Sequence, residues 1–432
     1  MKKIAVIGFA KSGKGALALL KRKMGDAQFA LFDDKLADGV NIFPISEYKD
    51  DFDLTVISPG IPPKRLPEIK GEILNEIDLA YAELEKESRV IGVTGTNGKS
   101  TVTHLAAQIL NNLSVDAVAC GNIGYPFSNA VMSRGGRGVF VTELSSFQIE
   151  LMKNIEIAAC SVTNLTPDHL DRYNSVEEYY NAKLRALYFV RENGLVTAGL
   201  NPLIANNALK HRLKVLYIDD DLESFPKKIG DKLDFGPFYI DVRGFHLFGR
   251  HNLVNLSHAL LLASSVLPLE GDATDLIGVL TAMPHRTEYI GSAKGVAWIN
   301  DSKATNVDST LTALKSCFYP TAVLLGGRDK RGDFRRLAGE LNRCAKEICL
   351  FGEAAHIIGG QLEGLVKADL IYTGDLKDTV KYLSREDGLN TVILSPGCAS
   401  FDEFANYEER GDKFAEYFKL FALEDNLSGD RI

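Results

Sequence analysis

The 432-residue chain has the proportions of an ordinary folded protein, with 45% hydrophobic residues, 25% charged residues and a formal net charge of -8. At roughly 150 residues per domain, this length predicts about three domains, each large enough to bury its own core. The acidic balance offers no basic surface for neutralising a phosphate backbone or an anionic membrane. It therefore argues against nucleic acid as the main partner.

Cysteine spacing and hydropathy indicate the cellular setting. The six cysteines are irregularly spaced with no C-x-x-C pair, so they predict neither a disulfide framework nor a zinc site. The apolar run from Ile4 to Ala10 is ended by Lys11 and Lys14, which favours a buried strand over a signal peptide. Because no stretch of about 18 uninterrupted apolar residues occurs, we expect no membrane span and a location in the reducing cytoplasm.

Residues 1–88 alternate short β-rich runs with helical stretches, which is the pattern of a parallel α/β sheet. The first run enters the turn Gly8-Phe-Ala-Lys-Ser-Gly13, placed as a dinucleotide-binding fingerprint would be, and Asp33 follows where a ribose-binding acid would stand. Ala10, however, occupies the position of the second glycine of that fingerprint. Two interpretations stay open: a nucleotide-binding turn, and a tight strand-to-helix turn that binds nothing.

The strands expected in this first segment are residues 4–7, 29–32 and 54–57. The third of them leads into Ser58-Pro-Gly-Ile-Pro-Pro63, at the carboxyl end of a strand, where α/β sheets place ligand-binding loops. The same prolines and glycine also suit an ordinary turn.

A second α/β segment opens with a phosphate-binding loop. The β-branched run at residues 89–94 continues directly into Gly95-Thr-Asn-Gly98-Lys99-Ser100-Thr101, and helix-compatible sequence follows to Asn112. In this context backbone amides and the helix N-terminus meet phosphates, a lysine reaches the β and γ oxygens, and a serine hydroxyl can ligate Mg²⁺. Val93 stands where the strict pattern has its first glycine, so the loop is a variant.

A carboxylate follows the next apolar strand. The run at residues 139–142 delivers Glu143 at its end, as a metal-ligating carboxylate beside a phosphate-binding loop is delivered. Mg²⁺ prefers oxygen ligands together with substrate phosphates. The alternative is a solvated carboxylate at a strand end.

A histidine and a lysine complete the candidates in the middle of the chain. His169 stands in Asp168-His-Leu-Asp171, after the apolar run at residues 158–162, and is interpreted either as a second metal ligand or as a structural histidine. A capping box of Ser175 and Glu178 is expected to start a helix that carries Lys183. A partly buried lysine beside metals can react with CO₂ to give a carbamate, and a surface ion pair is the other interpretation.

The third segment begins near Met283-Pro-His-Arg286, after a long helix that follows Asn252 and Asn255. It alternates strand-like and helical runs, which predicts another small α/β domain. The expected strands are residues 296–299, 322–325, 348–351 and 391–394. The predicted domains are therefore residues 1–88, 89–282 and 283–432.

At these motifs the sequence resembles the Mur ligases. The resemblance rests on residues 95–101, on Glu143-Leu-Ser-Ser-Phe-Gln148, on residues 168–171 and on Lys183 in Ala182-Lys-Leu-Arg185, and it covers nearly the whole chain. The Leu-Ser-Ser-Phe-Gln run looks like the members that add D-glutamate. The resemblance implies an α/β fold in three domains: an N-terminal Rossmann-like UDP-binding domain, a central P-loop ATPase domain and a C-terminal Rossmann-like domain that binds the amino acid.

The activity that this resemblance implies is an ATP-dependent amide ligation in peptidoglycan synthesis. D-glutamate would be added to UDP-N-acetylmuramoyl-L-alanine through an acyl phosphate, with ATP and two Mg²⁺ ions as cofactors and with no nucleic acid or membrane partner. Such an enzyme is expected to be a cytoplasmic monomer that serves cell wall formation, cell shape and cell division.

The resemblance also implies a role for each matching residue. Lys99, His169, Lys183 and Lys303 would be catalytic. Mg²⁺ would be held by Ser100, Glu143, His169 and carbamylated Lys183. ATP would be bound by Gly95, Thr96, Asn97, Gly98, Lys99, Ser100, Thr101, Asn252, Asn255, Arg286 and Asp301. The UDP substrate would be bound by Ser12, Asp33, Asp34, Ser58, Gly60 and Asn122. D-glutamate would be bound by Thr305, Lys330, Ser400 and Tyr407, where the family pattern has phenylalanine in place of Tyr407.

Rival functions of three kinds stay open. Within the same class stand a sister ligase for another amino acid and a folylpolyglutamate synthase. From another class comes a nicotinamide-dependent oxidoreductase, which only the first 35 or so residues favour and which Ala10 and the phosphate-binding loop oppose. The third is a P-loop switch or scaffold whose nucleotide governs the binding of a partner.

Overall fold

The computed structural model describes residues 2–34, 41–168, 172–245, 247, 249–329 and 331–423. The chain divides into two compact units, each described by itself below. The first unit comprises Met1–Gly244 and Val254–Leu280, and the second comprises Phe245–Leu253 and Thr281–Ile432. The predicted boundaries after residues 88 and 282 stay predictions.

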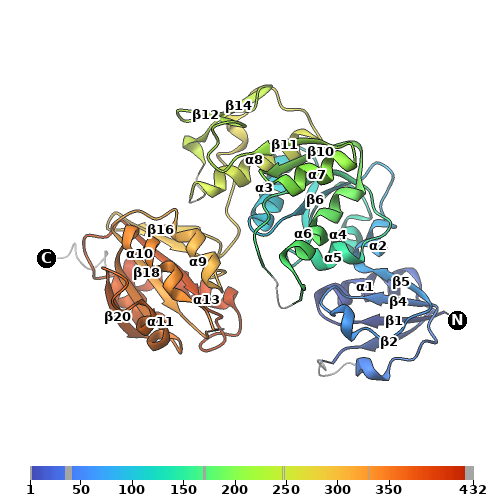
Figure 1. Ribbon diagram of the computed structural model, residues 1–432, viewed down its shortest axis with the longest axis horizontal. Coiled ribbons are helices and arrows are strands. Elements are labelled where there is room, and N and C mark those ends of the chain that lie inside the picture. Colours follow the sequence, from blue (N-terminus) through green and yellow to red (C-terminus); the bar gives the residue numbers. More distant parts are fainter. Residues whose placement is uncertain are drawn as a thin grey trace. The chain divides into compact units, whose positions relative to one another are not determined.

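The first unit starts with a five-stranded parallel sheet in the order β3-β2-β1-β4-β5 (Figure 1). All three strands predicted in this segment are present. The strands are β1 Lys3–Ile7, β2 Gln28–Phe32, β3 Ile42–Phe43, β4 Leu54–Ile57 and β5 Glu72–Asn75, and the helices are α1 Lys11–Lys23 and α2 Glu76–Tyr81. Every residue of β4 is buried, as expected for a parallel strand covered on both faces.

The same unit contains a six-stranded parallel sheet in the order β11-β10-β9-β6-β8-β7. Its strands are β6 Arg89–Thr94, β7 Ala117–Gly121, β8 Val139–Glu143, β9 Ile157–Val162, β10 Val190–Gly199 and β11 Lys214–Ile218. The helices are α3 Lys99–Asn112, α4 Phe127–Arg134, α5 Ser146–Leu151, α6 Val176–Leu184, α7 Pro202–Lys210 and α8 His251–Ser264, the last of which runs from the second unit into the first.

The order of these strands creates a switch point beside β6. The connection after β6 leads to β7 and β8 on one side, whereas the strands after β9 continue on the other side. Ligands of open α/β sheets bind at the carboxyl ends of strands where the direction of winding changes. The loops after β6 and β9 therefore form the part of this sheet best suited to a ligand.

A small sheet of β12 to β15, which was not predicted from the sequence, completes the first unit. Its strands are β12 Lys227–Ile229, β13 Lys232–Asp234, β14 Phe238–Asp241 and β15 Gly271–Asp272. The rings of Phe235 and Phe238 stack with centroids 4.5 Å apart. These strands are too short to show a clear alternation of apolar and polar residues.

Buried acids join the two large sheets of the first unit. Helix α4 follows Pro126, which offers no side-chain cap, and the Glu76 carboxylate of α2 instead accepts a 2.6 Å hydrogen bond from the Ser128 amide. Asp78 of α2 accepts hydrogen bonds from the amides of Lys153 and Asn154, just beyond α5. Burial raises the pKa of Glu76. The carboxyl group that caps α4 through the Ser128 amide is therefore also a desolvated one.

The second unit is built on one six-stranded sheet in the order β16-β17-β21-β18-β19-β20. Only β16, at one edge, runs antiparallel to its neighbour. The strands are β16 Glu288–Ala293, β17 Val296–Asn300, β18 Thr321–Gly326, β19 Ala345–Phe351, β20 Asp369–Gly374 and β21 Thr391–Gly397. The helices are α9 Val307–Leu314, α10 Ala338–Cys344, α11 Ala355–Leu362, α12 Leu376–Leu383 and α13 Tyr407–Tyr417.

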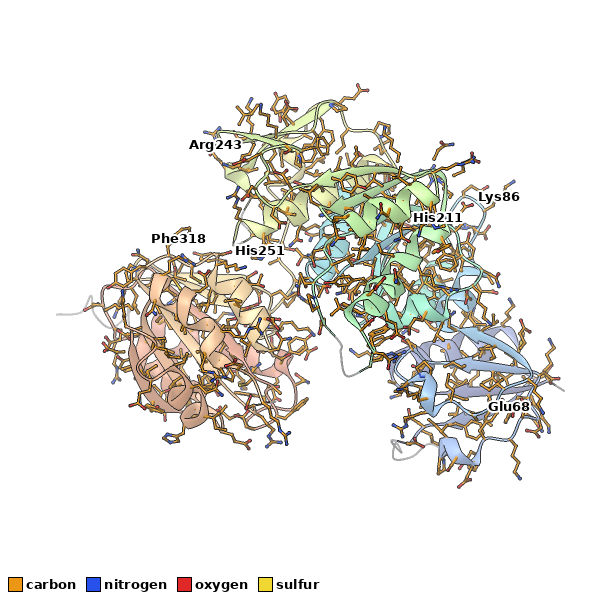
Figure 2. All side chains as sticks on the ribbon, viewed as in Figure 1. Glu68, Lys86, His211, Arg243, His251 and Phe318 are labelled. Carbon is orange, nitrogen blue, oxygen red and sulfur yellow. The ribbon has the colours of Figure 1, made fainter. Side chains whose placement is uncertain are left out.

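The four strands predicted for this segment match β17, β18, β19 and β21, whereas β16 and β20 were not predicted. Both missed strands lie at the edges of the sheet, where partly exposed residues interrupt the apolar run. On the outside of the units, Lys86 and Phe318 project from the surface (Figure 2). Within the described residues, no helix is both long and apolar enough to cross a membrane.

Candidate active site

The phosphate-binding loop, residues 95–101, turns tightly between β6 and α3. Gly95 and Gly98 have φ angles of +133° and +80°, which residues other than glycine rarely adopt. A Cβ on Gly95 would lie 2.0 Å from Thr163 Oγ1. Because Gly98 is the N-cap of α3 and has no capping side chain, the first amides of this helix suit an anionic ligand.

The loop that follows β9 holds the phosphate-binding loop in place. The Thr96 amide donates to the Asn164 carbonyl at 2.9 Å, and the Asn97 amide donates to Asn164 Oδ1 at 2.9 Å. Thr163 Oγ1 donates to the Asn97 carbonyl at 2.6 Å. No role was predicted for Thr163 or Asn164, and their position directly after a buried strand was the only signal in the sequence.

Two predicted phosphate ligands lie at the start of α3. Lys99 Nζ donates a 2.7 Å hydrogen bond to the Thr96 carbonyl, so the ammonium group lies folded against the loop. Ser100 is buried in the first turn of the helix. Phosphate oxygens are stronger acceptors for an ammonium group than a peptide carbonyl is. A bound phosphate would therefore replace the Thr96 carbonyl as the acceptor for Lys99.

Glu143 is buried at the end of β8, with 2% of its surface exposed. Its Oε1 atom accepts a 2.9 Å hydrogen bond from Asn122 Nδ2, whereas Oε2 is buried and has no hydrogen-bond partner in the described part of the chain. An unsatisfied buried carboxylate oxygen is costly and suits a cation. The amide of Asn122, predicted to meet the muramoyl sugar, thus also orients Glu143.

Residues 144–148 continue from Glu143 into a complete capping box. Ser145 Oγ accepts from the Gln148 amide at 3.3 Å, and the Ser145 amide donates to Gln148 Oε1 at 3.0 Å. The run that carries the family resemblance therefore has a structural role as well, because it starts α5 and fixes the direction of the chain after Glu143.

Lys183 lies on α6 with 2% of its surface exposed, and its Nζ donates a 2.7 Å hydrogen bond to the Gly95 carbonyl. The same nitrogen lies 4.6 Å from the centroid of the Tyr179 ring. Burial, and secondly the positive charge of Lys99, lower the pKa of Lys183 to about 6. The prediction of a surface ion pair is wrong for this lysine. His169 lies outside the described residues.

The capping box predicted for α6 is only half correct. Ser175 Oγ accepts from the Glu178 amide at 3.1 Å, as a cap should. The Glu178 carboxylate, however, accepts from the amide and side chain of Asn174. Within the described part of the chain, the Ser175 amide is not among its donors. The helix begins where the sequence predicted, through a different second hydrogen bond.

The turn after β1 is closed by close packing. A Cβ on Gly8, whose φ is +89°, would lie 2.6 Å from Ser58 Cβ, and one on Gly13 would lie 2.0 Å from the Gly8 carbonyl oxygen. Asp33 Oδ2 accepts a 2.6 Å hydrogen bond from the Phe9 amide. The backbone therefore makes a tight turn, as both interpretations require, and Asp33 supports the turn.

The other residues predicted for the UDP substrate lie around this turn. Ser12 is half-buried in the first turn of α1, which has no side-chain cap, and Gly60 is exposed. Asp34 pairs with Arg65 and accepts from the Ile45 amide at 3.0 Å. Asp33 and Asp34 thus both support the loops that surround the turn.

Asn252 and Asn255 are both buried on α8. A Cβ on Gly98 would lie 2.4 Å from Asn255 Oδ1, which places the amide of Asn255 against the phosphate-binding loop. Only glycine at position 98 leaves room for this approach.

In the second unit, Asp301 lies at the end of β17 with its carboxylate buried. Oδ2 accepts a 2.7 Å hydrogen bond from the Ser395 hydroxyl, and Oδ1 accepts from the Thr287 amide at 3.1 Å. Burial raises the pKa of Asp301 to about 7, against the smaller opposing effects of these hydrogen bonds and of Arg286. Two predicted ATP ligands, Arg286 and Asp301, thus interact electrostatically.

The structure brings Lys303, predicted to be catalytic, against Tyr407, predicted to bind D-glutamate. Lys303 Nζ lies 3.7 Å from the centroid of the Tyr407 ring, a close cation–π contact. The Tyr407 carbonyl accepts from the Ser302 hydroxyl at 2.8 Å. Thr305 lies two residues after Lys303 and is half-buried, and its amide donates to the Lys303 carbonyl. Lys330 lies outside the described residues.

A buried arginine, which the sequence analysis missed, lies beneath this group. Arg410 is fully buried and donates to the carbonyls of Ser302 and Cys398 at 2.8 and 3.1 Å. Burial lowers its pKa to about 10. Ser400, predicted for D-glutamate, is also buried in this region with 2% of its surface exposed. Nothing in the pattern of the sequence separates Arg410 from a surface arginine on α13.

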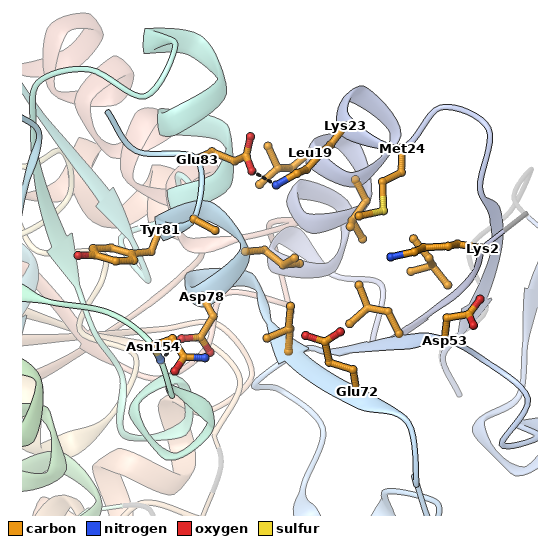
Figure 3. A pocket seen from close by; sticks show the side chains of 16 residues that line it. Lys2, Leu19, Lys23, Met24, Asp53, Glu72, Asp78, Tyr81, Glu83 and Asn154 are labelled. Atoms are coloured by element: carbon orange, nitrogen blue, oxygen red, sulfur yellow. Dashed lines mark hydrogen bonds and ion pairs between the residues drawn. The ribbon is translucent and has the colours of Figure 1, made fainter. Parts of the chain in front are cut away.

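The first unit also has a pocket of about 480 Å³ near the amino-terminal ends of β1, β4 and β5 (Figure 3). Ile4, Leu20 and Leu54 contribute to its apolar lining, and Lys23 pairs with Glu83 at its edge. None of the predicted site residues line it. Since the turn after β1 lies at the opposite ends of the same strands, this pocket is distinct from the predicted substrate site.

Comparison with known proteins gives consistent results. The Mur ligase middle domain matches residues 93–263, and the Mur ligase, glutamate ligase domain matches residues 285–398. The UDP-N-acetylmuramoylalanine–D-glutamate ligase of Caldicellulosiruptor bescii is 31% identical, over 96% of this chain and 97% of that protein. The protein of the same name from Aquifex aeolicus is 33% identical, over 97% of this chain and 99% of its own.

Solved structures show the same fold. The MurF ligase of Thermotoga maritima in complex with ADP aligns with a TM-score of 0.62, covering 98% of this chain and 95% of its own, at 16% identity. At that identity the likeness supports the predicted α/β fold and carries no conclusion about the substrate.

Proposed function

The chain belongs to the Mur ligase family, and on that premise we propose that it adds D-glutamate to UDP-N-acetylmuramoyl-L-alanine in a reaction that consumes ATP. The γ-phosphoryl group passes from ATP to the alanyl carboxylate, and the amine of D-glutamate then displaces phosphate from the acyl phosphate. The products are ADP, phosphate, a proton and a new amide. Similarity to D-glutamate ligases along nearly the full length supports this substrate over those of a sister ligase or a folylpolyglutamate synthase.

The observation that carries this proposal is the pair of lysines that contact the phosphate-binding loop, Lys99 at its end and Lys183 from α6. Lys99 and Lys183 donate to the neighbouring carbonyls of Thr96 and Gly95, at 2.7 Å each. Phosphoryl transfer needs positioning and the neutralisation of dense negative charge more than it needs covalent chemistry. Lys99 is proposed to contact the β and γ phosphates, while the amides of residues 95–101 would hold the rest of the polyphosphate.

Magnesium fits beside this loop. The buried Oε2 atom of Glu143 and the Ser100 hydroxyl are the protein oxygens proposed for the first ion, which would neutralise phosphate charge when bound. Among the described residues, no three His, Cys, Asp or Glu side chains gather in a metal-binding arrangement. Phosphate oxygens would therefore supply part of the coordination. A second ion would depend on His169 and on Lys183.

Lys183 is proposed to act as a carbamate. An amine whose pKa is about 6 is mostly uncharged at neutral pH and can attack CO₂, forming an N–C bond and releasing a proton. The carbamate keeps one N–H, which can still donate to the Gly95 carbonyl, and it replaces a buried cation with an anion suited to Mg²⁺. The Lys183 environment supports this modification because it disfavours the ammonium form.

The second unit is proposed to supply the amino acid site. Lys303 and Thr305 would lie near the reacting carboxyl group, and Lys330, Ser400 and Tyr407 would hold the carboxylates of D-glutamate. A dicarboxylate suits ammonium and hydroxyl donors in a sheltered site. Arg286 and Asp301, together with Asn252 and Asn255, would bind ATP.

The first sheet is proposed to bind UDP at its carboxyl edge. The turn from Gly8 to Gly13, with Ser12, would meet the diphosphate, while Asp33 and Asp34 would meet uridine from their places beside that turn. Ser58 and Gly60 would complete the site, with Asn122 at the muramoyl sugar. Replacement of a fingerprint glycine by Ala10 is compatible with a ligand other than NAD.

We further propose that the protein acts as a cytoplasmic monomer on small-molecule substrates, and so supports cell shape and division through wall synthesis. The reaction is tested by measuring ADP release from Mg-ATP and UDP-N-acetylmuramoyl-L-alanine with each of several amino acids. Release that depends on D-glutamate supports the proposal, and equal release without it contradicts the proposal. Quenching of protein fluorescence by NADH at low concentration would instead favour the oxidoreductase alternative.

A further inference from the structure

Arg172 makes an unusual set of contacts in the first unit. Its guanidinium carbon lies 3.9 Å from the centroid of the Phe147 ring, and Nη2 donates to Glu150 at 3.1 Å. Its Nη1 atom donates a 3.2 Å hydrogen bond to the Pro59 carbonyl, in the loop that follows β4. Phe147 and Glu150 both belong to α5. One side chain thus joins the loop of residues 58–61 to the helix that starts directly after Glu143.

This arginine is placed where burial opposes its charge. Only 11% of its side chain is exposed, and its Nε atom is buried without a hydrogen-bond partner among the residues that the structure describes. A buried arginine with an incomplete set of partners is a poor source of stability, because desolvation offsets much of the attraction. Its contacts favour a role in holding two segments in register.

The contact continues towards the phosphate-binding loop through a row of aromatic rings. The Phe147 and Tyr173 centroids lie 6.0 Å apart, and those of Tyr173 and Tyr179 lie 5.4 Å apart. The Tyr179 hydroxyl lies 3.3 Å from Thr96 Oγ1, and Lys183 Nζ lies over the Tyr179 ring. Aromatic pairs at these distances attract one another beyond the effect of the area that they bury.

From these contacts we propose that Arg172 is a positioning residue for the nucleotide substrate. It fixes the loop of residues 58–61, and through the Phe147–Tyr173–Tyr179 row it holds that loop in register with Thr96 of the phosphate-binding loop. This inference rests on the proposed function, because it takes residues 58–61 as part of the UDP-substrate site. Arg172 itself touches neither reacting group.

Arg185 provides a matched control within the same unit. Its Nη2 atom donates to the Met152 carbonyl at 3.0 Å, and its guanidinium lies 5.8 Å from the Phe189 centroid. Like Arg172 it combines a cation–π contact with a carbonyl hydrogen bond near the end of α5. Among the described residues, however, its contacts do not include residues 58–61.

The test compares Arg172→Ala with Arg185→Ala by calorimetric titration with UDP-N-acetylmuramoyl-L-alanine and, separately, with Mg-ADP. Loss of a charge-assisted hydrogen bond and a cation–π contact predicts a rise of about tenfold or more in the Kd for the UDP nucleotide in Arg172→Ala. The Kd for Mg-ADP should stay within about twofold of wild type, a spread of a few tenths of a kcal/mol. Methylguanidinium, added below concentrations that unfold the protein, should restore part of the lost affinity.

The outcomes separate this inference from the proposed function. An unchanged Kd for the UDP nucleotide in Arg172→Ala overturns the inference, and so does an equal weakening of both ligands with a lower melting temperature, which indicates general destabilisation. If wild type binds the UDP nucleotide but D-glutamate does not stimulate ADP release, only the proposed role of D-glutamate as the amino acid substrate fails. If wild type does not bind the UDP nucleotide, both proposals fail.

Discussion

Lys183 Nζ donates a 2.7 Å hydrogen bond to the carbonyl oxygen of Gly95, at the first residue of the phosphate-binding loop. The contact joins helix α6 to the loop after β6, so the position of this lysine is coupled to the geometry of the loop. Since burial and Lys99 lower the pKa of Lys183 to about 6, its uncharged amine is the principal form at neutral pH.

Lys183→Ala is expected to lose most activity, because it removes both the contact with Gly95 and the group proposed to be carbamylated. Bicarbonate with a short carboxylic acid should restore part of the D-glutamate-dependent ADP release, since a small anion can occupy the space of the carbamate. Lys210→Ala, at an exposed position on α7, serves as the control and should keep wild-type rates. Full metal binding without any rescue would count against the carbamate.

Glu143→Gln is expected to lower kcat by about a hundredfold, because the neutral amide keeps the shape of the side chain but loses the charge proposed to hold Mg²⁺. The magnesium concentration that gives half-maximal activity should rise in the variant. Asp116→Asn, which alters an exposed ion pair with Arg134 in the same unit, should leave both quantities unchanged. An unaltered magnesium dependence in Glu143→Gln would remove this carboxylate from the metal site.

Tyr407 is expected to act through its ring, which lies against the Lys303 ammonium at 3.7 Å. Tyr407→Phe keeps the aromatic face, so its KM for D-glutamate should stay within about twofold of wild type. Tyr407→Leu removes the cation–π contact and should raise that KM by roughly threefold to thirtyfold, while the KM for ATP changes little. Equal effects of both substitutions would show that the hydroxyl, not the ring, is what matters.

Local sequence patterns predicted most of the helices, strands and loops that carry the site. They predicted few of the contacts between those elements. Strand runs followed by glycine or a carboxylate located β6, β8 and the phosphate-binding loop, because each pattern depends only on neighbours in sequence. Thr163 and Asn164, which brace that loop, were missed because their partners are distant in the chain. The same applies to Arg410, whose burial depends on the packing of the whole second unit.

The capping motifs show a second limit. Ser145 with Gln148 and Ser175 with Glu178 have the same spacing, yet only the first pair forms the complete box in the structure. Glu178 instead accepts hydrogen bonds from Asn174, a competing donor one residue earlier than the cap. Spacing thus predicts where a helix begins, and the identity of the preceding residue decides which hydrogen bonds close it.

The pH dependence of stability should reveal the buried carboxyl group of Asp301. Its pKa is raised to about 7 in the folded protein from 3.8, so between these values the folded state binds more protons than the unfolded state. The contribution of Asp301 to the free energy of unfolding therefore falls as pH rises through that window. The melting temperature of wild type relative to Asp301→Asn should decrease from about pH 4 to pH 7, since the amide does not titrate. A difference between wild type and Asp301→Asn that stays constant or grows with pH would contradict the raised pKa.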